Sequence, residues 1–202
     1  PSKSPSLYVT RAKIQLEHRH YAAAVRSLTL ALKVTPGNAE AYKLRGGAYD
    51  KMGASQRAIQ DYTRYIELRP RDLQGYLLRG DAKHFGGEHE AALGDYNTAI
   101  RMSSRSIPAY MGRGLAYAAL GKYSLAMKDY QWILALDPEN SEAAENMGLA
   151  CMRAGRPILA VSYFERALQN EIDPAWRARI HKWMDQVVND PSLSSRKSDR
   201  PE

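Results

Sequence analysis

The sequence predicts an all-α protein built from a repeated pair of helices. Three observations predict this fold class: a 34-residue period, glycine and proline at fixed places in each period, and apolar residues at helical spacing. The segments YKLRGGAYDKMG, YLLRGDAKHFGG and YMGRGLAYAALG begin at Tyr42, Tyr76 and Tyr110, each 34 residues after the one before. A period of this length is typical of stacked helix–turn–helix repeats.

The period divides most of the chain into five repeats, which follow a short N-terminal segment (1–6) that we expect to be disordered. The repeats span residues 5–38, 39–72, 73–106, 107–140 and 141–172. The eighth position is small in every repeat: Ala12, Gly46, Gly80, Gly114 and Gly148. The twentieth is always alanine: Ala24, Ala58, Ala92, Ala126 and Ala160. The twenty-fourth is large and apolar: Leu28, Tyr62, Tyr96, Tyr130 and Phe164. Small residues let two helices approach closely, and large residues fill the space between them.

Glycine and proline indicate where the two helices of each repeat begin and end. Glycine follows the expected first helix of repeats 2–5 at Gly53, Gly87, Gly121 and Gly155. A glycine there suits the end of a helix, because it adopts left-handed backbone angles without strain. Pro157 falls in the first turn of the last second helix, where its missing N–H does no harm.

After the fifth repeat, residues 173–190 read DPAWRARIHKWMDQVVND. Asp173 is a candidate N-cap and Pro174 a first-turn residue. One apolar stripe at helical spacing comprises Trp176, Ile180, Trp183, Met184, Val187 and Val188. This pattern predicts a helix that caps the array, and the alternative is an amphipathic partner-binding or membrane-surface helix. The polar segment 191–202 is expected to be disordered.

The repeated positions resemble the tetratricopeptide repeat family over residues 5–172. The resemblance implies a right-handed α-solenoid of antiparallel helix pairs that binds other proteins and has no catalytic activity. It also implies a concave groove lined by the first helix of each repeat. The clamp that chaperone adaptors of this family use is not matched, because Lys43 fits the pattern but Gly47, Leu78, Pro108 and Gly112 do not.

The resemblance places candidate groove residues at fixed positions of each first helix. They are Lys13, Lys43, Asp50, Leu77, Asp81, His84, Met111, Leu115, Leu149 and Met152. The groove is charged in the early repeats and apolar in the late ones, and an exposed apolar strip usually indicates a binding surface. We expect a partner peptide or helix with an apolar part against repeats 3–5 and an acidic part toward repeats 1 and 2. The alternative is that some of these apolar residues pack against the next helix or the cap helix.

Arginine at the seventh position and aspartate at the twenty-third recur together in repeats 2–4. The pairs are Arg45 with Asp61, Arg79 with Asp95, and Arg113 with Asp129, each separated by sixteen residues. We interpret them as structural ion pairs between the two helices of a repeat, and the alternative is an arginine row that holds phosphate or carboxylate groups. If they are pairs, Arg79→Leu destabilises the fold and adding Asp95→Leu restores much of the loss.

Other functional classes receive little support from the sequence. It has no Gly-rich phosphate loop, zinc-ligand spacing or nucleophile elbow, so we expect no enzyme activity, cofactor, metal or small-molecule substrate. The net charge of +7 permits acidic partners, but no regular polar code supports RNA binding, which stays a minor alternative. Without a signal peptide or an apolar run of membrane length, we expect a cytoplasmic protein that does not bind membranes. A second alternative is a self-association scaffold that uses its convex face or the cap helix.

Overall fold

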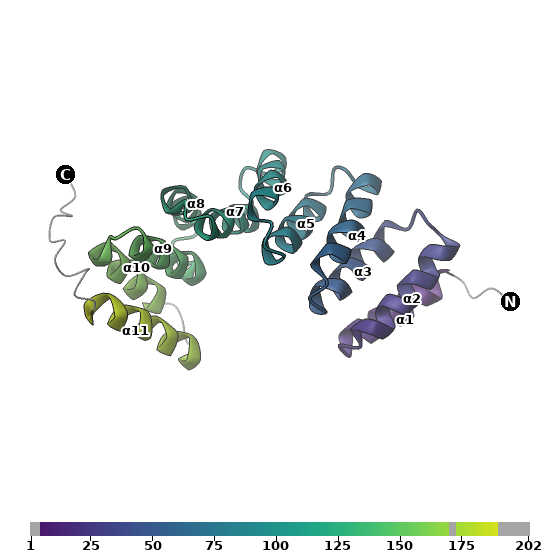
Figure 1. The fold of residues 1–202 in the computed structure, drawn as a ribbon, viewed down its shortest axis with the longest axis horizontal. Helices are drawn as coiled ribbons and strands as arrows, with labels where there is room; N and C mark the ends of the chain where they lie inside the picture. Colours follow the sequence, from purple (N-terminus) through teal and green to yellow (C-terminus); the bar gives the residue numbers. More distant parts are fainter. Residues whose placement is uncertain (1–4, 170–172, 190–202) are drawn as a thin grey trace. The chain divides into compact units, whose positions relative to one another are not determined.

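The computed structural model describes residues 5–169 and 173–189, and these residues form helices joined by short turns (Figure 1). The chain divides into two compact parts, an N-terminal body of residues 1–106 and a C-terminal body of residues 107–202. Of the expected disordered start, residues 1–4 lie outside the described residues, whereas residues 5 and 6 begin the first helix. The whole expected tail at 191–202 lies outside the described residues. The all-α prediction is confirmed.

The N-terminal body contains three helix pairs. They are α1 (Pro5–Glu17) with α2 (Tyr21–Val34), α3 (Ala39–Lys51) with α4 (Ser55–Leu68), and α5 (Leu73–Phe85) with α6 (His89–Met102). Each helix packs against the next helix along the chain, so the three pairs stack in sequence order (Figure 1). This arrangement brings successive first helices to one side of the stack, and α1 also contacts α3.

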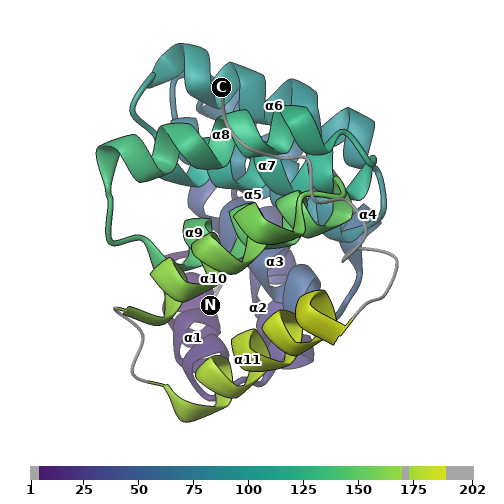
Figure 2. The same ribbon diagram turned by 90° about the vertical axis from the view of Figure 1, so that its left-hand side faces the viewer.

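The C-terminal body contains two helix pairs and a final helix. They are α7 (Ile107–Ala119) with α8 (Tyr123–Leu136), α9 (Ser141–Arg153) with α10 (Pro157–Gln169), and α11 (Pro174–Asn189). The last helix packs on α10 and also contacts α9, and Figure 2 shows α9, α10 and α11 in this order. Within the described residues, none of the helices combines the length and the apolar character needed to cross a bilayer.

The helix ends follow from local side-chain chemistry. Asn38 and Asn140 accept hydrogen bonds from the backbone N–H groups of Ala41 and Ala143, so they cap α3 and α9. The turn after the first helix of repeats 2–5 has a positive φ at its glycine, between 69° and 84°. In repeat 1 the same place holds Arg19, with φ 58°, a conformation that costs a non-glycine residue free energy.

The large residue at the twenty-fourth position packs directly on the small residue at the eighth. A Cβ atom on Gly46 would lie 2.7 Å from the Tyr62 ring, and one on Gly114 would lie 2.6 Å from the Tyr130 ring. Gly80 with Tyr96 and Gly148 with Phe164 repeat this contact. Because these rings are buried and cannot move aside, only glycine permits the observed approach of the two helices.

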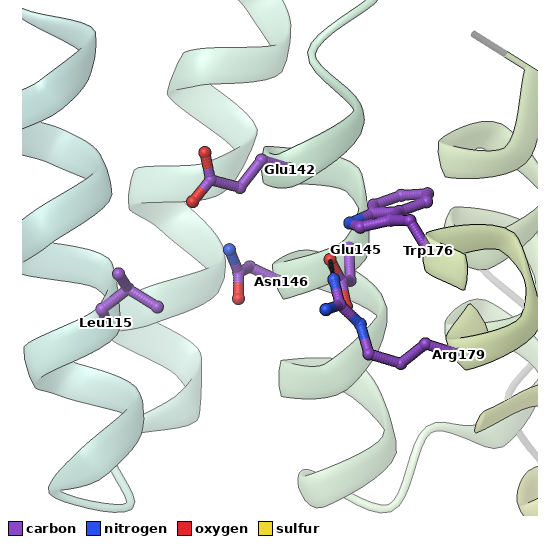
Figure 3. A pocket seen from close by; sticks show the side chains of 6 residues that line it. All are labelled: Leu115, Glu142, Glu145, Asn146, Trp176 and Arg179. Carbon is purple, nitrogen blue, oxygen red and sulfur yellow. Dashed lines mark hydrogen bonds and ion pairs between the residues drawn. The ribbon is translucent and has the colours of Figure 1, made fainter. Parts of the chain in front are cut away.

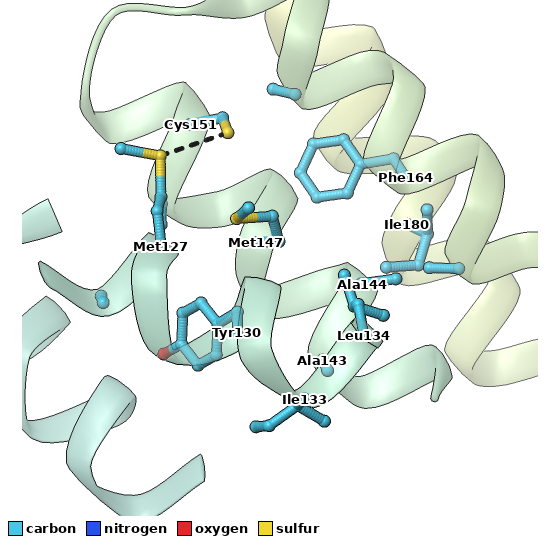
Figure 4. Packing of buried hydrophobic residues seen from close by; sticks show 14 of the residues in the cluster. Met127, Tyr130, Ile133, Leu134, Ala143, Ala144, Met147, Cys151, Phe164 and Ile180 are labelled. Atoms are coloured by element: carbon cyan, nitrogen blue, oxygen red, sulfur yellow. Dashed lines mark hydrogen bonds between the residues drawn. The ribbon is translucent and has the colours of Figure 1, made fainter. Parts of the chain in front are cut away.

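The core of the C-terminal body includes α11 (Figure 4). Ile180 from α11 is fully buried and belongs to the same cluster as Ile133 and Phe164. Val187 is also buried, whereas Val188, which the apolar stripe included, is 68% exposed because its side chain faces solvent. The apolar face of α11 therefore serves largely as packing surface for the preceding helix pair.

Cys151 lies fully inside this core, with its Sγ atom 3.5 Å from the Met127 Sδ atom. Burial raises the pKa of the Cys151 thiol to about 11, and the positive charge of Arg156 only partly opposes this rise. A buried neutral thiol of this kind behaves as a small apolar residue.

Candidate functional site

The arginine and aspartate residues of repeats 2–4 form bidentate ion pairs between the two helices of each pair. Arg45 donates from Nε and Nη2 to the two carboxylate oxygens of Asp61, at 2.8 and 2.7 Å, and from Nη1 to Thr29 Oγ1 at 3.1 Å. Arg45 therefore links three consecutive helices, α2, α3 and α4. Asp61 is only 4% exposed, so its charge depends on the guanidinium for compensation.

The same geometry recurs in the other two repeats. Arg79 contacts both oxygens of Asp95 at 3.0 and 2.6 Å. Arg113 contacts both oxygens of Asp129 at 2.9 and 2.7 Å. Asp95 differs in having a second cation, because Lys83 Nζ also lies 2.8 Å from its Oδ2 atom. In all three repeats an internal carboxylate pairs with the arginine guanidinium. Few guanidinium N–H groups therefore remain to bind phosphate or carboxylate groups of a ligand.

The early groove candidates lie on the first helices of the N-terminal body. Lys13 on α1 and Lys43 on α3 both contact Glu40, at 3.5 and 2.9 Å. Leu77 on α5 is half-buried. The His84 Nδ1 atom lies 3.1 Å from His89 Nδ1, and burial, followed by the charge of that neighbour, lowers the pKa of His84.

The remaining groove candidates of the N-terminal body, Asp50 and Asp81, accept hydrogen bonds from tyrosine hydroxyls. Tyr62 donates to Asp50 Oδ2 at 2.6 Å, and Tyr96 donates to Asp81 Oδ1 at 2.7 Å. Burial raises the pKa of Asp81, the Tyr96 hydrogen bond opposes the rise, and the negative charge of Asp50 adds to it. Burial likewise raises the pKa of Asp50, against the Tyr62 hydrogen bond. Both carboxylates are thus partly desolvated and already hydrogen-bonded within the chain.

The late groove candidates lie on α7 and α9 of the C-terminal body. Leu115, Leu149 and Met152 are half-buried, whereas Met111 is 9% exposed and belongs to the apolar core. The Asn146 amide donates a weak hydrogen bond to the Met111 Sδ atom at 3.6 Å. Met111 therefore contributes mainly to packing in this structure, and the other three remain accessible.

Two adjoining pockets are lined by α7, α9 and α11, and α8 also lines the second. The first, of about 490 Å³, is lined by Leu115, Glu142, Glu145, Asn146, Trp176 and Arg179. Figure 3 shows Leu115 on one side and the α9 and α11 side chains on the other. Arg179 donates to both oxygens of Glu145, at 3.0 and 2.9 Å, and its guanidinium lies over the Trp176 ring.

The second pocket, of about 400 Å³, shares Leu115 and Asn146 with the first. Its walls are Leu115, Ala118, Tyr123, Tyr130, Asn146, Leu149, Ala150, Arg153 and Trp183. These side chains are largely apolar, with a few polar groups, which is the usual composition of a binding pocket. We name the first pocket the Glu142 pocket and the second the Tyr130 pocket.

The groove candidates taken from the sequence do not include the α11 residues of these pockets. Continuing the 34-residue register one repeat further places Trp176, Arg179 and Trp183 at the second, fifth and ninth positions of a sixth first helix. These are the positions that line the groove elsewhere in the array. The 34-residue register was therefore the sequence signal that could have identified these three residues. In that register α11 corresponds to the first helix of a sixth repeat.

Models of known protein families match most of the sequence. A tetratricopeptide repeat model matches residues 9–72 and 48–110, and another matches residues 107–140. The chain belongs to the tetratricopeptide repeat (TPR) family. TPR proteins generally mediate protein–protein interactions and are generally not enzymes. Within the described residues of this TPR chain, no cluster of three or more His, Cys, Asp or Glu side chains could hold a metal ion.

Solved TPR structures resemble the chain over most of its length. A crystal structure of MamA is 26% identical, with a TM-score of 0.75, and the match covers 83% of this chain and 91% of MamA. PilW, described as a type IV pilus biogenesis factor, is 18% identical, with a TM-score of 0.79 and coverage of 94% and 88%. YrrB, described as a TPR protein with an unusual peptide-binding site, is 16% identical, with a TM-score of 0.70 and coverage of 87% and 90%. No curated protein matched the chain.

Proposed function

We propose that this TPR protein is a non-catalytic scaffold that binds a peptide segment or helix of a partner protein along its first helices. The observation that carries the proposal is the pair of pockets lined by α7, α9 and α11, with α8 contributing to the second. Leu115 lines both pockets and Leu149 lines the Tyr130 pocket, and both side chains are only half-buried in the free chain. Covering such apolar side chains releases water from them and favours association.

We assign candidate binding residues to each body separately. The N-terminal body contributes Lys13, Lys43, Asp50, Leu77, Asp81 and His84, and the C-terminal body contributes Met111, Leu115, Leu149 and Met152. Buried ion pairs hold the helices of repeats 2–4 and glycine–aromatic contacts hold those of repeats 2–5. The protein side therefore loses little conformational entropy on binding there. YrrB, a structural neighbour described as having a peptide-binding site, supports the proposal by analogy of fold alone.

A display library of short random peptides tests this function. We expect the wild-type chain to select peptides that the Leu149→Glu variant no longer binds, because a charge in the groove repels an apolar segment. Ile158→Glu is the matched control, since Ile158 on α10 is 65% exposed and lines neither pocket. Peptides that bind all three proteins equally would contradict groove binding.

A second candidate is self-association through the second helices or α11. It is favoured by exposed apolar residues, Ile158 and Leu159 on α10 and Val188 on α11, which are 65%, 39% and 68% exposed. Sedimentation velocity at increasing protein concentration tests it. A dimer that Ile158→Glu dissociates, and Leu149→Glu leaves intact, would support self-association in place of groove binding.

A further inference from the structure

The tyrosine at the twenty-fourth position has an internal hydrogen-bond acceptor in the N-terminal body. Tyr62 and Tyr96 each pack on a glycine of the facing first helix and donate their hydroxyl to a carboxylate on that same helix. The acceptor is Asp50, at the twelfth position, in repeat 2 and Asp81, at the ninth position, in repeat 3. A carboxylate at either of these two positions, which are three residues apart on the first helix, can thus accept the hydrogen bond of the tyrosine hydroxyl.

Repeat 4 keeps the tyrosine but lacks both acceptors. Tyr130 packs on Gly114 as its counterparts do, yet the ninth and twelfth positions hold Leu115 and Ala118. Tyr130 is 1% exposed, and its hydroxyl makes no hydrogen bond to any residue that the structure describes. Figure 4 shows the hydroxyl pointing away from Phe164 and Ile180. The Tyr130 pocket lies where the other repeats have a carboxylate.

Two more donors without partners line the same pocket. The Trp183 Nε1 atom is buried, and no acceptor for it exists in the described part of the chain. Arg153 is exposed and forms no ion pair with a described residue. No Asp or Glu of the described residues lines the pocket. Among the described side chains, only the Trp183 Nε1 atom is both buried and without a hydrogen-bond partner. Because a buried donor without an acceptor costs free energy, a ligand that supplies the acceptor gains affinity there.

We propose that the Tyr130 pocket binds an aspartate or glutamate side chain of the partner segment, with an adjacent apolar residue against Leu115 and Leu149. The carboxylate takes the place that Asp50 and Asp81 fill in the other repeats, accepts hydrogen bonds from Tyr130 and Trp183, and pairs with Arg153. This inference rests on the proposed groove function and specifies the chemistry of the partner.

The neighbouring pocket restricts where the carboxylate can bind. Glu142, which is exposed and forms no ion pair among the described residues, lies in the Glu142 pocket beside the Glu145–Arg179 pair. One positive and two negative groups give that pocket a net negative charge, whereas Arg153 is the only charged residue among the described walls of the Tyr130 pocket. Electrostatic complementarity therefore directs an acidic side chain to the Tyr130 pocket and away from its neighbour.

Paired libraries test the requirement for a carboxylate. One library of short random peptides, with amidated C-termini, contains all residue types, and the other omits aspartate and glutamate. We expect Leu149-dependent binders from the complete library to contain an acidic residue beside an apolar one. Replacing that residue by its amide, Asp by Asn or Glu by Gln, should weaken binding by about tenfold or more, as charge-assisted hydrogen bonds predict.

Two variants test the position of the carboxylate. Tyr130→Phe keeps the ring and removes only the donor, so it should weaken the acidic peptide by about tenfold and leave the amide twin unaffected. Ala118→Asp reproduces the internal acceptor of repeat 2 and should exclude the acidic peptide while the chain stays folded by circular dichroism. Tyr62→Phe is the matched control in the N-terminal body and should leave peptide affinity unchanged.

The outcomes separate this inference from the proposed function. Leu149-dependent peptides that need no acidic residue, or that bind the wild type and Tyr130→Phe equally, would overturn the carboxylate site while the groove function stands. Acidic peptides whose affinity falls with Tyr130→Phe and whose amide twins do not respond would support it. If neither library yields Leu149-dependent peptides, the groove function and the carboxylate site both fail.

Discussion

The two bodies of this TPR protein use the same helix-pair packing but treat the same tyrosine differently. In the N-terminal body the buried hydroxyls of Tyr62 and Tyr96 donate to Asp50 and Asp81. In the C-terminal body Tyr130 sits on its glycine in the same way but has no acceptor among the described residues, and a pocket adjoins it. The same apolar packing forms the helix pairs of both bodies. A carboxylate at the ninth or twelfth position of a repeat accepts the tyrosine hydroxyl, and where neither position has one, the hydroxyl is available to a ligand.

The ion pairs give a second comparison between repeats. Asp61 is compensated only by Arg45 among the described residues, whereas Asp95 has both Arg79 and Lys83. The sequence spacing of Arg and Asp indicated the pairs, but not the additional lysine. Arg79→Leu is therefore a weaker test of a buried pair than Arg45→Leu, because Lys83 keeps part of the compensation.

The largest expected effect is the loss of Arg45. Arg45→Leu leaves Asp61 buried without a cation and should lower the free energy of unfolding by about 3–5 kcal/mol. Adding Asp61→Leu should restore much of that loss, since no unpaired charge remains. Urea unfolding of the single and double variants measures the coupling. Single losses that simply add in the double variant, or an Arg79→Leu loss larger than that of Arg45→Leu, would contradict this account.

The glycine–tyrosine contact should matter equally in both bodies. Gly46→Ala and Gly114→Ala each place a methyl group against a buried ring, and each should cost about 1–3 kcal/mol in thermal or urea unfolding. Gly94→Ala is the control, because a Cβ there meets nothing within 4 Å. That variant should stabilise the protein by about 0.5–1 kcal/mol. Similar effects of all three alanines would show that the contact is not tight.

The hydroxyl groups themselves should distinguish the two bodies. Tyr62→Phe removes the donor to the partly buried Asp50 and should cost about 1 kcal/mol of stability. Tyr130→Phe removes a hydroxyl that has no described acceptor, so the free protein should lose almost nothing. Chemical unfolding of the two variants side by side provides the measurement. A loss for Tyr130→Phe as large as that for Tyr62→Phe would contradict the difference.

The smallest expected effect is a pH dependence in the N-terminal body. The pKa of His84 is lowered in the folded protein, first by burial and then by His89, from an ordinary value of 6.5. The unfolded chain therefore binds a proton more readily, and stability falls as the pH drops below 6.5 toward the folded pKa. Melting temperatures at pH 7 and at mildly acidic pH should differ less for His84→Gln than for the wild type. An unchanged difference would exclude His84 as the cause.

Much of the fold could be read from the sequence because short-range packing repeats with the period. The 34-residue spacing, the small eighth and twentieth positions and the glycines at helix ends belong to individual helix pairs, so they appear as local patterns. The residues that line the groove were harder to predict from the sequence. Met111 occupies a groove position but is nearly buried, and Trp183 on α11 lines a pocket that the sequence prediction did not include. Burial depends on what the neighbouring helices contribute, which no single repeat contains.

The sequence by itself determined the helix pairs, their order and the residues available for pairing between them. It did so because helix periodicity, capping and close approach at glycine depend on residues near one another in the chain or one period apart. Only the tertiary structure decided which polar groups remain without a partner. Lys83 joins the Asp95 pair, and Tyr130, Arg153 and Trp183 meet at one pocket, because neighbouring helices bring them together in space. That convergence depends on distances across the stack, which a one-dimensional pattern does not record.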